Sequence, residues 1–372
     1  MSKTLTEIAQ QLKDANKKVQ LIYAFNGTGK TRLSREFKQL ISPKADDEDS
    51  LSSDLAAKKV LYYSAFTEDL FYWDNDLGQD AEPKLKIQPN SFTKWVLEEQ
   101  GQDQSITGTF QRYTSEKLTP LFSADFSSVS FSFERGNNQQ ERNIKISKGE
   151  ESNFIWSVFN ALLEQVISEL NIAEPANRST DVFNNLQYVF VDDPVSSLDE
   201  SHLIELAVNL PGLIKSSQSA ALRFIITTHS PLFYNVLFNE FNHKACYMLE
   251  RLDDGSFTLT EKPGDSNKSF SYHLHLLQTI EQAIADQKVE RYHFTLLRNL
   301  YEKTAGFLGY PKWSELLPDD KQLYYSRIIN FTSHSTLSNE AMALPTPAEK
   351  ATVKLLTDHL KSQHAFWQQQ AA

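Results

Sequence analysis

The chain has 372 residues, 40% of them hydrophobic and 23% charged, which is typical of a globular protein long enough for two domains. Its net charge of −11 argues against a general nucleic-acid coat protein. No apolar run approaches the ~18 residues of a membrane span, and the polar N-terminus has no signal-peptide core. The single cysteine, Cys246, excludes an intrachain disulfide, so we expect a cytoplasmic protein with no membrane association.

The charge is distributed unevenly along the chain. Residues 261–372 contain 12 Lys and Arg and 12 Asp and Glu, so the whole negative excess lies in residues 1–260. This asymmetry predicts a boundary between two domains, residues 1–260 and residues 261–372.

The first motif follows a predicted strand at residues 19–24. The sequence AFNGTGKT (residues 24–31) leads into a helical pattern at residues 32–40 and matches a phosphate-binding loop, with Ala24 in place of the first glycine. Lys30 would reach the β- and γ-phosphates of a nucleotide, and Thr31 would bind Mg²⁺. The candidate nucleotide-binding residues here are Asn26, Gly27, Thr28, Gly29, Lys30 and Thr31.

The next hundred residues are less informative. Residues 45–58 are acidic and serine-rich, which favours a solvated loop, and residues 59–64 predict a strand. Residues 80–145 predict an irregular, partly β region. A capping box, Ser147 with Glu150, then predicts the start of a long apolar helix within ISKGE (residues 146–150).

A buried strand at residues 188–191 ends in two carboxylates, Asp192 and Asp193. Carboxylates at the C-terminal edge of a parallel sheet can hold Mg²⁺ and polarise an attacking water. We expect a helix at residues 200–210, ending at Pro211, and another buried strand that ends at His229.

In this order and spacing, AFNGTGKT, ISKGE, VDDPVSSLD and TTHS resemble the motifs of an ABC-type ATPase head. The resemblance implies an α/β fold in residues 1–260 that binds ATP or GTP with Mg²⁺, held by Thr31 and Asp192. It implies that Asp193 stands where most transporters carry a catalytic glutamate. The glutamine that ABC-type ATPases carry after an early strand is missing, and Glu68 is a weak substitute. The further residues implied are Ser147, Gly149 and Glu150, which cap the γ-phosphate held by an opposite subunit, Asp199 at the dimer interface, and His229 as γ-phosphate sensor.

Residues 261–372 predict a mainly α-helical domain, with helices at residues 272–284, 288–307, 321–329 and 347–363. Arg298 and Glu302 are four residues apart and share a helix face, where an ordinary surface ion pair is the simplest interpretation. His334 follows 32 residues after Glu302, and Arg327 stands seven residues before it.

An ABC-type head followed by this arginine, glutamate and histidine is similar to the PrrC-type anticodon nucleases. The phrases IYAFNGTGKTRLSREF and LRNLYEKTAGFLGY carry the same resemblance. It implies a HEPN-like nuclease domain that cuts tRNA-Lys at its anticodon, and regulation by a type I DNA restriction–modification complex in antiviral defence. It also implies a homodimer or tetramer formed through the heads. The implied nuclease residues are Arg298, Glu302, His334 and, from the HEPN pattern, Arg327; those implied in tRNA recognition are Asp265, Ser266 and His273.

The chemistry of these residues is coherent without a metal. A base can remove the proton of a ribose 2′-OH, an acid can protonate the leaving 5′-oxygen, and arginine can stabilise the phosphorane. The products are a 2′,3′-cyclic phosphate and a 5′-OH; whether His334 or Glu302 is the base stays open. The alternative is a DNA-repair or sensor ATPase whose C-terminal helices only bind a partner.

Overall fold

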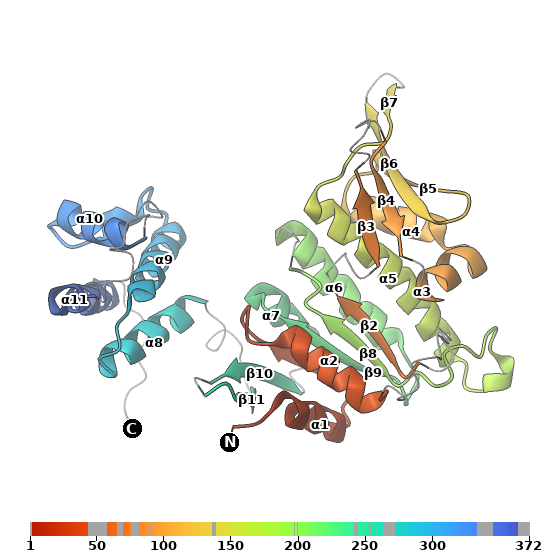
Figure 1. Cartoon of the computed structure of the whole chain (residues 1–372), viewed down its shortest axis with the longest axis horizontal. Helices are drawn as coiled ribbons and strands as arrows, with labels where there is room; N and C mark the ends of the chain where they lie inside the picture. Colours follow the sequence, from red (N-terminus) through yellow and green to blue (C-terminus); the bar gives the residue numbers. More distant parts are fainter. Residues whose placement is uncertain are drawn as a thin grey trace. The chain divides into compact units, whose positions relative to one another are not determined.

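The protein divides into two compact units, Met1–Gly264 and Asp265–Ala372. Figure 1 shows the computed structural model, which describes residues 2–43, 58–64, 70–75, 82–88, 91–135, 139–196, 198, 200–241, 245–252, 254–262, 272–332 and 345–363. The boundary expected from charge, after residue 260, falls inside strand β11 (Phe257–Glu261), which completes the main sheet of the first unit.

The first unit is organised around a six-stranded sheet with the order β11-β10-β1-β9-β8-β2. The strands from β10 to β2 are parallel and β11 is antiparallel to β10. The central strands are apolar almost throughout, as expected where both faces of a sheet are covered. The other strands are β1 (Val19–Tyr23), β2 (Val60–Ser64), β8 (Tyr188–Asp192), β9 (Arg223–Thr228) and β10 (Cys246–Arg251).

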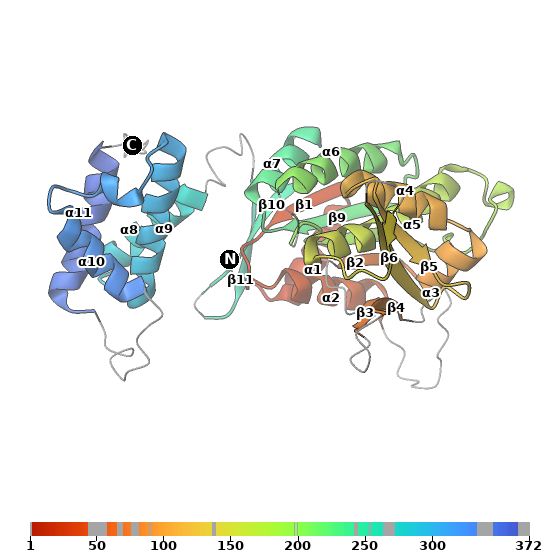
Figure 2. The ribbon, with the colours of Figure 1, turned by 90° about the horizontal axis from the view of Figure 1, so that it is seen from above.

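Helices cover both faces of this sheet. Figure 2 shows α1 (Leu5–Ala15) and α2 (Lys30–Ile41) on one face, and α6 (Glu200–Ser216) and α7 (Pro231–Glu240) on the other. Side chains alternate along each strand, so Phe190 packs against Phe37 of α2, while Tyr23 packs against Tyr234 of α7. This layering leaves the C-terminal strand edge free for a ligand.

Helix α6 is longer than the sequence predicted. We expected it to end before Pro211, but it continues to Ser216 with the proline inside. Leu206, Leu210 and Ile214 repeat every four residues and are fully buried. Burial of this stripe offsets the ~3 kcal/mol that an internal proline costs.

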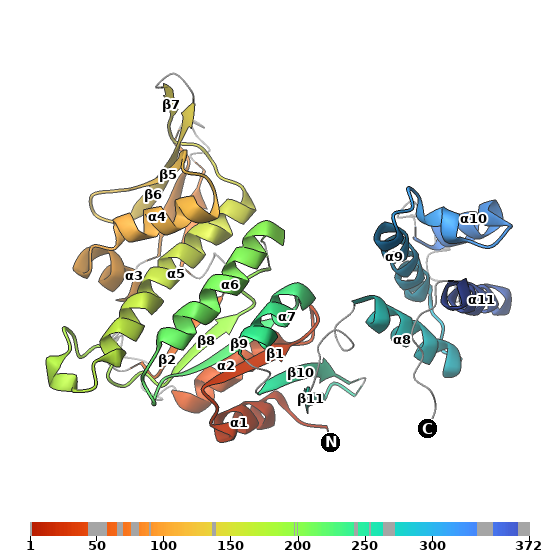
Figure 3. The same cartoon turned by 180° about the vertical axis from the view of Figure 1, so that it is seen from behind.

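The region expected to be irregular and partly β forms a second, antiparallel sheet with the order β3-β4-β6-β5, and β7 pairs with β6. Figure 3 shows α4 and α5 lying along this part of the molecule. The ring of Phe131 lies 5.4 Å from that of Phe154 and 5.7 Å from that of Phe110, which joins sheet to helices. The elements are β3 (Phe71–Asp74), β4 (Lys84–Ile87), α3 (Ser91–Lys94), η3 (Trp95–Glu99), α4 (Asp103–Tyr113), β5 (Leu118–Phe122), β6 (Ser128–Arg135), β7 (Gln139–Glu141), α5 (Lys148–Asn171) and η4 (Pro175–Asn177).

All regular elements described in the second unit are helices, which agrees with the predicted mainly α-helical character, and they pack around an apolar core of their own. The Tyr301 hydroxyl donates a hydrogen bond to the carbonyl of Leu356 at 2.9 Å, which fixes α9 against α11. Its elements are α8 (Tyr272–Ala285), α9 (Arg291–Leu308), η6 (Trp313–Leu316), α10 (Lys321–Thr332) and α11 (Pro347–Gln363). Across the described ranges of both units, no helix combines the length and apolar character that a membrane crossing requires.

Candidate functional site

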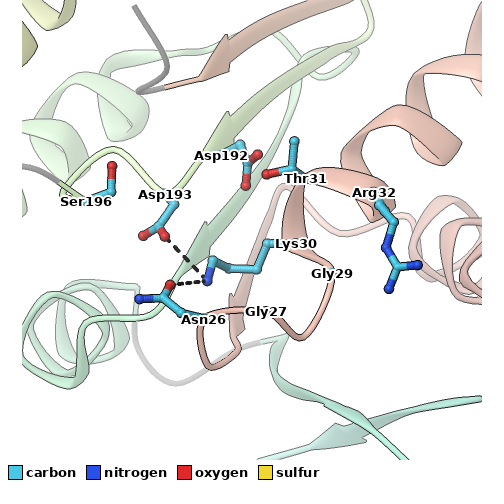
Figure 4. A pocket seen from close by; sticks show the side chains of 9 residues that line it. All are labelled: Asn26, Gly27, Gly29, Lys30, Thr31, Arg32, Asp192, Asp193 and Ser196. Atoms are coloured by element: carbon cyan, nitrogen blue, oxygen red, sulfur yellow. Dashed lines mark hydrogen bonds and ion pairs between the residues drawn. The ribbon is translucent and has the colours of Figure 1, made fainter. Parts of the chain in front are cut away.

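A cavity of about 350 Å³ opens at the C-terminal edge of the main sheet, between the β1–α2 loop and the end of β8. Figure 4 shows Lys30 extending from the start of α2 toward Asp193, with Asp192 facing Thr31. The sheet therefore brings together residues that lie more than 160 positions apart in sequence. The lining residues are Asn26, Gly27, Gly29, Lys30, Thr31, Arg32, Asp192, Asp193 and Ser196.

The loop geometry depends on two glycines with positive φ. Gly27 has φ of +80° and Gly29 has φ of +116°, a conformation that other residues rarely adopt. A Cβ on Gly29 would also lie 3.3 Å from the Arg32 guanidinium and 3.4 Å from the Phe257 ring. The close turn places the N-terminus of α2, with its free N–H groups and positive dipole end, at the cavity, which suits a phosphate group.

Lys30 is held inside the loop by oxygen atoms. Its Nζ lies 3.2 Å from the Ala24 carbonyl, 3.2 Å from Asn26 Oδ1 and 3.4 Å from Asp193 Oδ2, and the side chain is only 7% exposed. A buried ammonium requires such partners. Phosphate oxygens could replace some of these contacts, so the cation is already positioned for an anionic ligand.

Asp192 is fully buried and surrounded by hydroxyl groups. Thr227 donates a hydrogen bond to its Oδ1 at 2.7 Å, and Tyr62 donates to its Oδ2 at 3.1 Å. Thr31 also hydrogen-bonds this carboxylate, and burial nevertheless raises its pKa. A carboxylate beside a threonine hydroxyl is a donor set that suits Mg²⁺, and a cation would relieve the desolvation of Asp192.

Asp193 connects the loop lysine with the histidine of the next strand. Nδ1 of His229 lies 2.8 Å from Asp193 Oδ2, and the His229 backbone N–H donates to Oδ1 at 3.2 Å. Burial alone would raise the pKa of Asp193, but the hydrogen bonds from His229 and the charge of Lys30 outweigh it and lower the pKa. The carboxylate is thereby kept ionised, as a group that orients water requires.

Sequence reasoning missed Tyr62 as a member of this site. Its hydroxyl contacts both Asp192 and Ser34, and burial raises its pKa to about 12. The only signal in the sequence is its position two residues before the end of a predicted strand. The contact depends on the pairing of β2 with β8, in which Tyr62 lies opposite Phe190.

The ISKGE motif begins α5 through the predicted capping box. The Glu150 backbone N–H donates to Ser147 Oγ at 3.3 Å, and the Ser147 N–H donates to Glu150 Oε2 at 2.7 Å. In the described part of the chain, Ser147, Gly149 and Glu150 do not line the cavity around Lys30. Asp199 and Glu68 lie outside the described residues.

The second unit brings two of the sequence-predicted residues together. Arg298 Nε lies 2.7 Å from Glu302 Oε1 on α9, and both side chains are about one-third exposed. Arg327 lies on α10, and His273 on α8, but the structure does not describe their side chains. His334, Asp265 and Ser266 lie outside the described residues.

The glycine loop, the paired carboxylates and the parallel strand order define the first unit as a P-loop ATPase head of the ABC type. The chain is 68% identical over 393 aligned positions to a curated Escherichia coli protein named "Anticodon nuclease". The match covers all of this chain and 99% of the relative. The chain therefore belongs to the anticodon nuclease family. No family model matches it.

Solved structures with some likeness are heads of Smc proteins. One is the SmcHead bound to the C-winged helix domain of ScpA, at 12% identity and a TM-score of 0.33, covering 67% of this chain and 91% of that one. Another is the SMC head domain from Thermotoga maritima, at 12% identity and a TM-score of 0.29, covering 66% and 91%. Scores of this size carry no argument, so the fold assignment rests on the sheet and loop described above.

Proposed function

We propose that this chain is a nucleotide-gated endonuclease that cuts tRNA in its anticodon loop. The observation that carries this proposal is the 68% identity to an anticodon nuclease, which spans both units. A purely partner-binding C-terminal unit, the alternative considered from sequence, has no comparable support.

The first unit would be the gate. ATP or GTP would bind with its phosphates in the β1–α2 loop, and Thr31 and Asp192 would hold Mg²⁺, which neutralises phosphate charge. Asp193 would orient water, with its carboxylate fixed by Lys30 and His229. The residues proposed for nucleotide contact within one protomer are Asn26, Gly27, Thr28, Gly29, Lys30, Thr31, Asp192, Asp193 and His229.

The nuclease reaction would need no metal. One member of the pair Glu302 and His334 would take the proton of the ribose 2′-OH as that oxygen attacks the adjacent phosphorus atom. The other would protonate the departing 5′-oxygen, and Arg298 would stabilise the phosphorane, with Arg327 as a further cation. The 2.7 Å contact of Arg298 with Glu302 supports this proposal because it places a cation and a carboxylate on one accessible helix face.

The assembly and its regulation are also proposals. The capping-box motif lies outside its own protomer's nucleotide cavity, which favours contact with nucleotide bound by a second head in a homodimer or tetramer. Asp199 would stand at that interface. The family resemblance favours tRNA-Lys as substrate, with recognition by Asp265, Ser266 and His273, and a type I DNA restriction–modification complex as the restraining partner.

Incubation of purified protein with total tRNA, Mg²⁺ and ATP or GTP tests the function. We expect one cut in an anticodon loop, ending in a 2′,3′-cyclic phosphate and a 5′-OH. If a protein preparation that binds ATP or GTP normally leaves tRNA uncut in the presence of either nucleotide, the proposal is contradicted. Sequencing of the cleavage ends would also identify the tRNA.

A further inference from the structure

A second cavity lies wholly within the C-terminal unit, next to Glu302. Its volume is about 650 Å³, within the range of small-molecule sites. The end of α9, the short helix η6 and the start of α10 form its walls. The residues that line it include Glu302, Gly306, Tyr310, Lys312, Trp313, Lys321 and Tyr325.

One wall of the cavity is aromatic and rigid. The rings of Trp313 and Tyr325 are stacked, with centroids 5.2 Å apart and an interplanar angle of 24°. Both rings pack against the apolar core of the unit, which fixes their orientation. Tyr310, which is 43% exposed, adds a third aromatic side chain that solvent can reach.

Two lysines lie among the other residues that line the cavity. Lys312 and Lys321 are exposed, and Glu302 is the one acidic residue among the described lining residues. Gly306 lies one helical turn after Glu302, and a Cβ built on it meets no atom within 4 Å. The space directly beside Gly306 is therefore open, so a larger side chain there can extend into it.

We propose that this cavity binds one unpaired nucleobase of the RNA substrate, beside the phosphate that is cut. This inference rests on the proposed nuclease function, because Glu302 links the cavity to the reaction. Proteins hold unpaired RNA bases by stacking them on aromatic side chains, and lysines beside such a platform neutralise the flanking phosphates. Trp313, Tyr325 and Tyr310 supply the platform, and Lys312 and Lys321 supply the cations.

The substitution Gly306→Leu tests the cavity without removing a wall. The new side chain fills open space, and leucine favours a helix more than glycine does, so the protein should fold and bind nucleotide normally. We expect the Kd for an anticodon stem-loop RNA to rise about 5- to 150-fold, which is the change in affinity expected when one stacked base loses its binding site. Ala351→Leu, on an exposed position of α11, is the matched control and should leave the Kd unchanged.

Two further measurements separate the sources of binding. A 2-aminopurine in the loop of the RNA should lose fluorescence on binding to the wild-type protein and keep it with Gly306→Leu. Lys312→Ala with Lys321→Ala should weaken binding and reduce its salt dependence by about two charges. Lys354→Ala on α11, also an exposed lysine, should have the smaller effect.

A folded Gly306→Leu protein that binds and cuts RNA as the wild type does would overturn the nucleobase proposal and leave the nuclease function standing. Loss of cleavage with unchanged RNA affinity would also overturn it, because the cavity would then affect cutting without contributing to RNA binding. A wild-type protein that cuts no tRNA would instead contradict the proposed function itself.

Discussion

At the scale of single residues, the nucleotide cavity depends on charges that hold one another in place. Lys30, Asp193 and His229 form one chain of contacts, and Asp192 is held separately by hydroxyl donors. Each of these side chains is at least half buried, so water cannot replace a lost partner cheaply. Substitutions that remove one of these contacts should therefore change nucleotide binding or hydrolysis by amounts that can be measured.

Lys30→Ala should weaken ATP and GTP binding at least about 30-fold, which corresponds to ~2 kcal/mol for a buried charge contact. The substitution removes an ammonium that contacts both the Ala24 carbonyl and Asp193. Calorimetric titration with Mg²⁺ and nucleotide measures this, and Lys17→Ala, an exposed lysine, serves as control. Equal affinity of the two variants would contradict the nucleotide site.

Asp193→Asn should preserve nucleotide binding but slow hydrolysis by ~10²–10⁴-fold, because the amide cannot accept a proton from water. The amide is nearly the same size and can still contact Lys30. A phosphate-release assay at saturating nucleotide measures the rate. Hydrolysis at the wild-type rate would remove Asp193 from the proposed mechanism.

The positions of Lys30, Thr31 and Asp192 could be anticipated from sequence because a glycine loop and a strand end constrain them locally. Tyr62 could not, because its contact with Asp192 depends on which strand pairs with β8 and in which register. Register is set by packing over the whole sheet, and a single tyrosine in an apolar run carries no mark of it.

At the scale of elements, the same distinction between local and long-range signals applies. The buried strands β1, β8 and β9 could be predicted from continuous apolar runs, and the start of α5 from its capping box. The sequence predicted some β structure between residues 80 and 145, but not the second sheet itself, because its short strands are stabilised by long-range contacts such as Phe131 with Phe154. The helix end expected at Pro211 was wrong because tertiary burial outweighs local propensity.

Ser147→Asp separates the two roles proposed for the start of α5. Aspartate is as good an N-cap as serine, so the melting temperature should stay close to that of the wild type. Its charge would repel a γ-phosphate bound by a second protomer, so nucleotide-dependent self-association and hydrolysis should both be lost. Ser147→Ala removes the N-cap side chain, so it should lower the free energy of unfolding by ~1 kcal/mol.

Light scattering with and without nucleotide, together with thermal melts, checks both variants. If the aspartate variant assembles and hydrolyses nucleotide as the wild type does, the motif is only a helix cap.

At the scale of the whole molecule, the two units differ in net charge as well as in their proposed roles, nucleotide binding and RNA cleavage. The negative excess lies in the part that holds the nucleotide cavity, and the neutral C-terminal unit carries the exposed lysines beside Glu302. The charge difference between the two units can be read from the sequence. The aromatic cavity could not be predicted in this way, because it forms only when α9, η6 and α10 pack together. The proposed function links the two units: Arg298, Glu302 and His334 would cut RNA when the head binds nucleotide.

The most direct test measures tRNA cleavage by three separate variants, Arg298→Ala, Glu302→Ala and His334→Ala. The side chains of Arg298 and Glu302 are about one-third exposed. Loss of their ion pair should therefore change the free energy of unfolding by only ~0.3–0.5 kcal/mol and leave nucleotide binding intact. We predict that each variant loses cleavage by ~10²–10⁴-fold, with Lys354→Ala unaffected. Folded, nucleotide-binding variants that still cut tRNA at the wild-type rate would contradict the account.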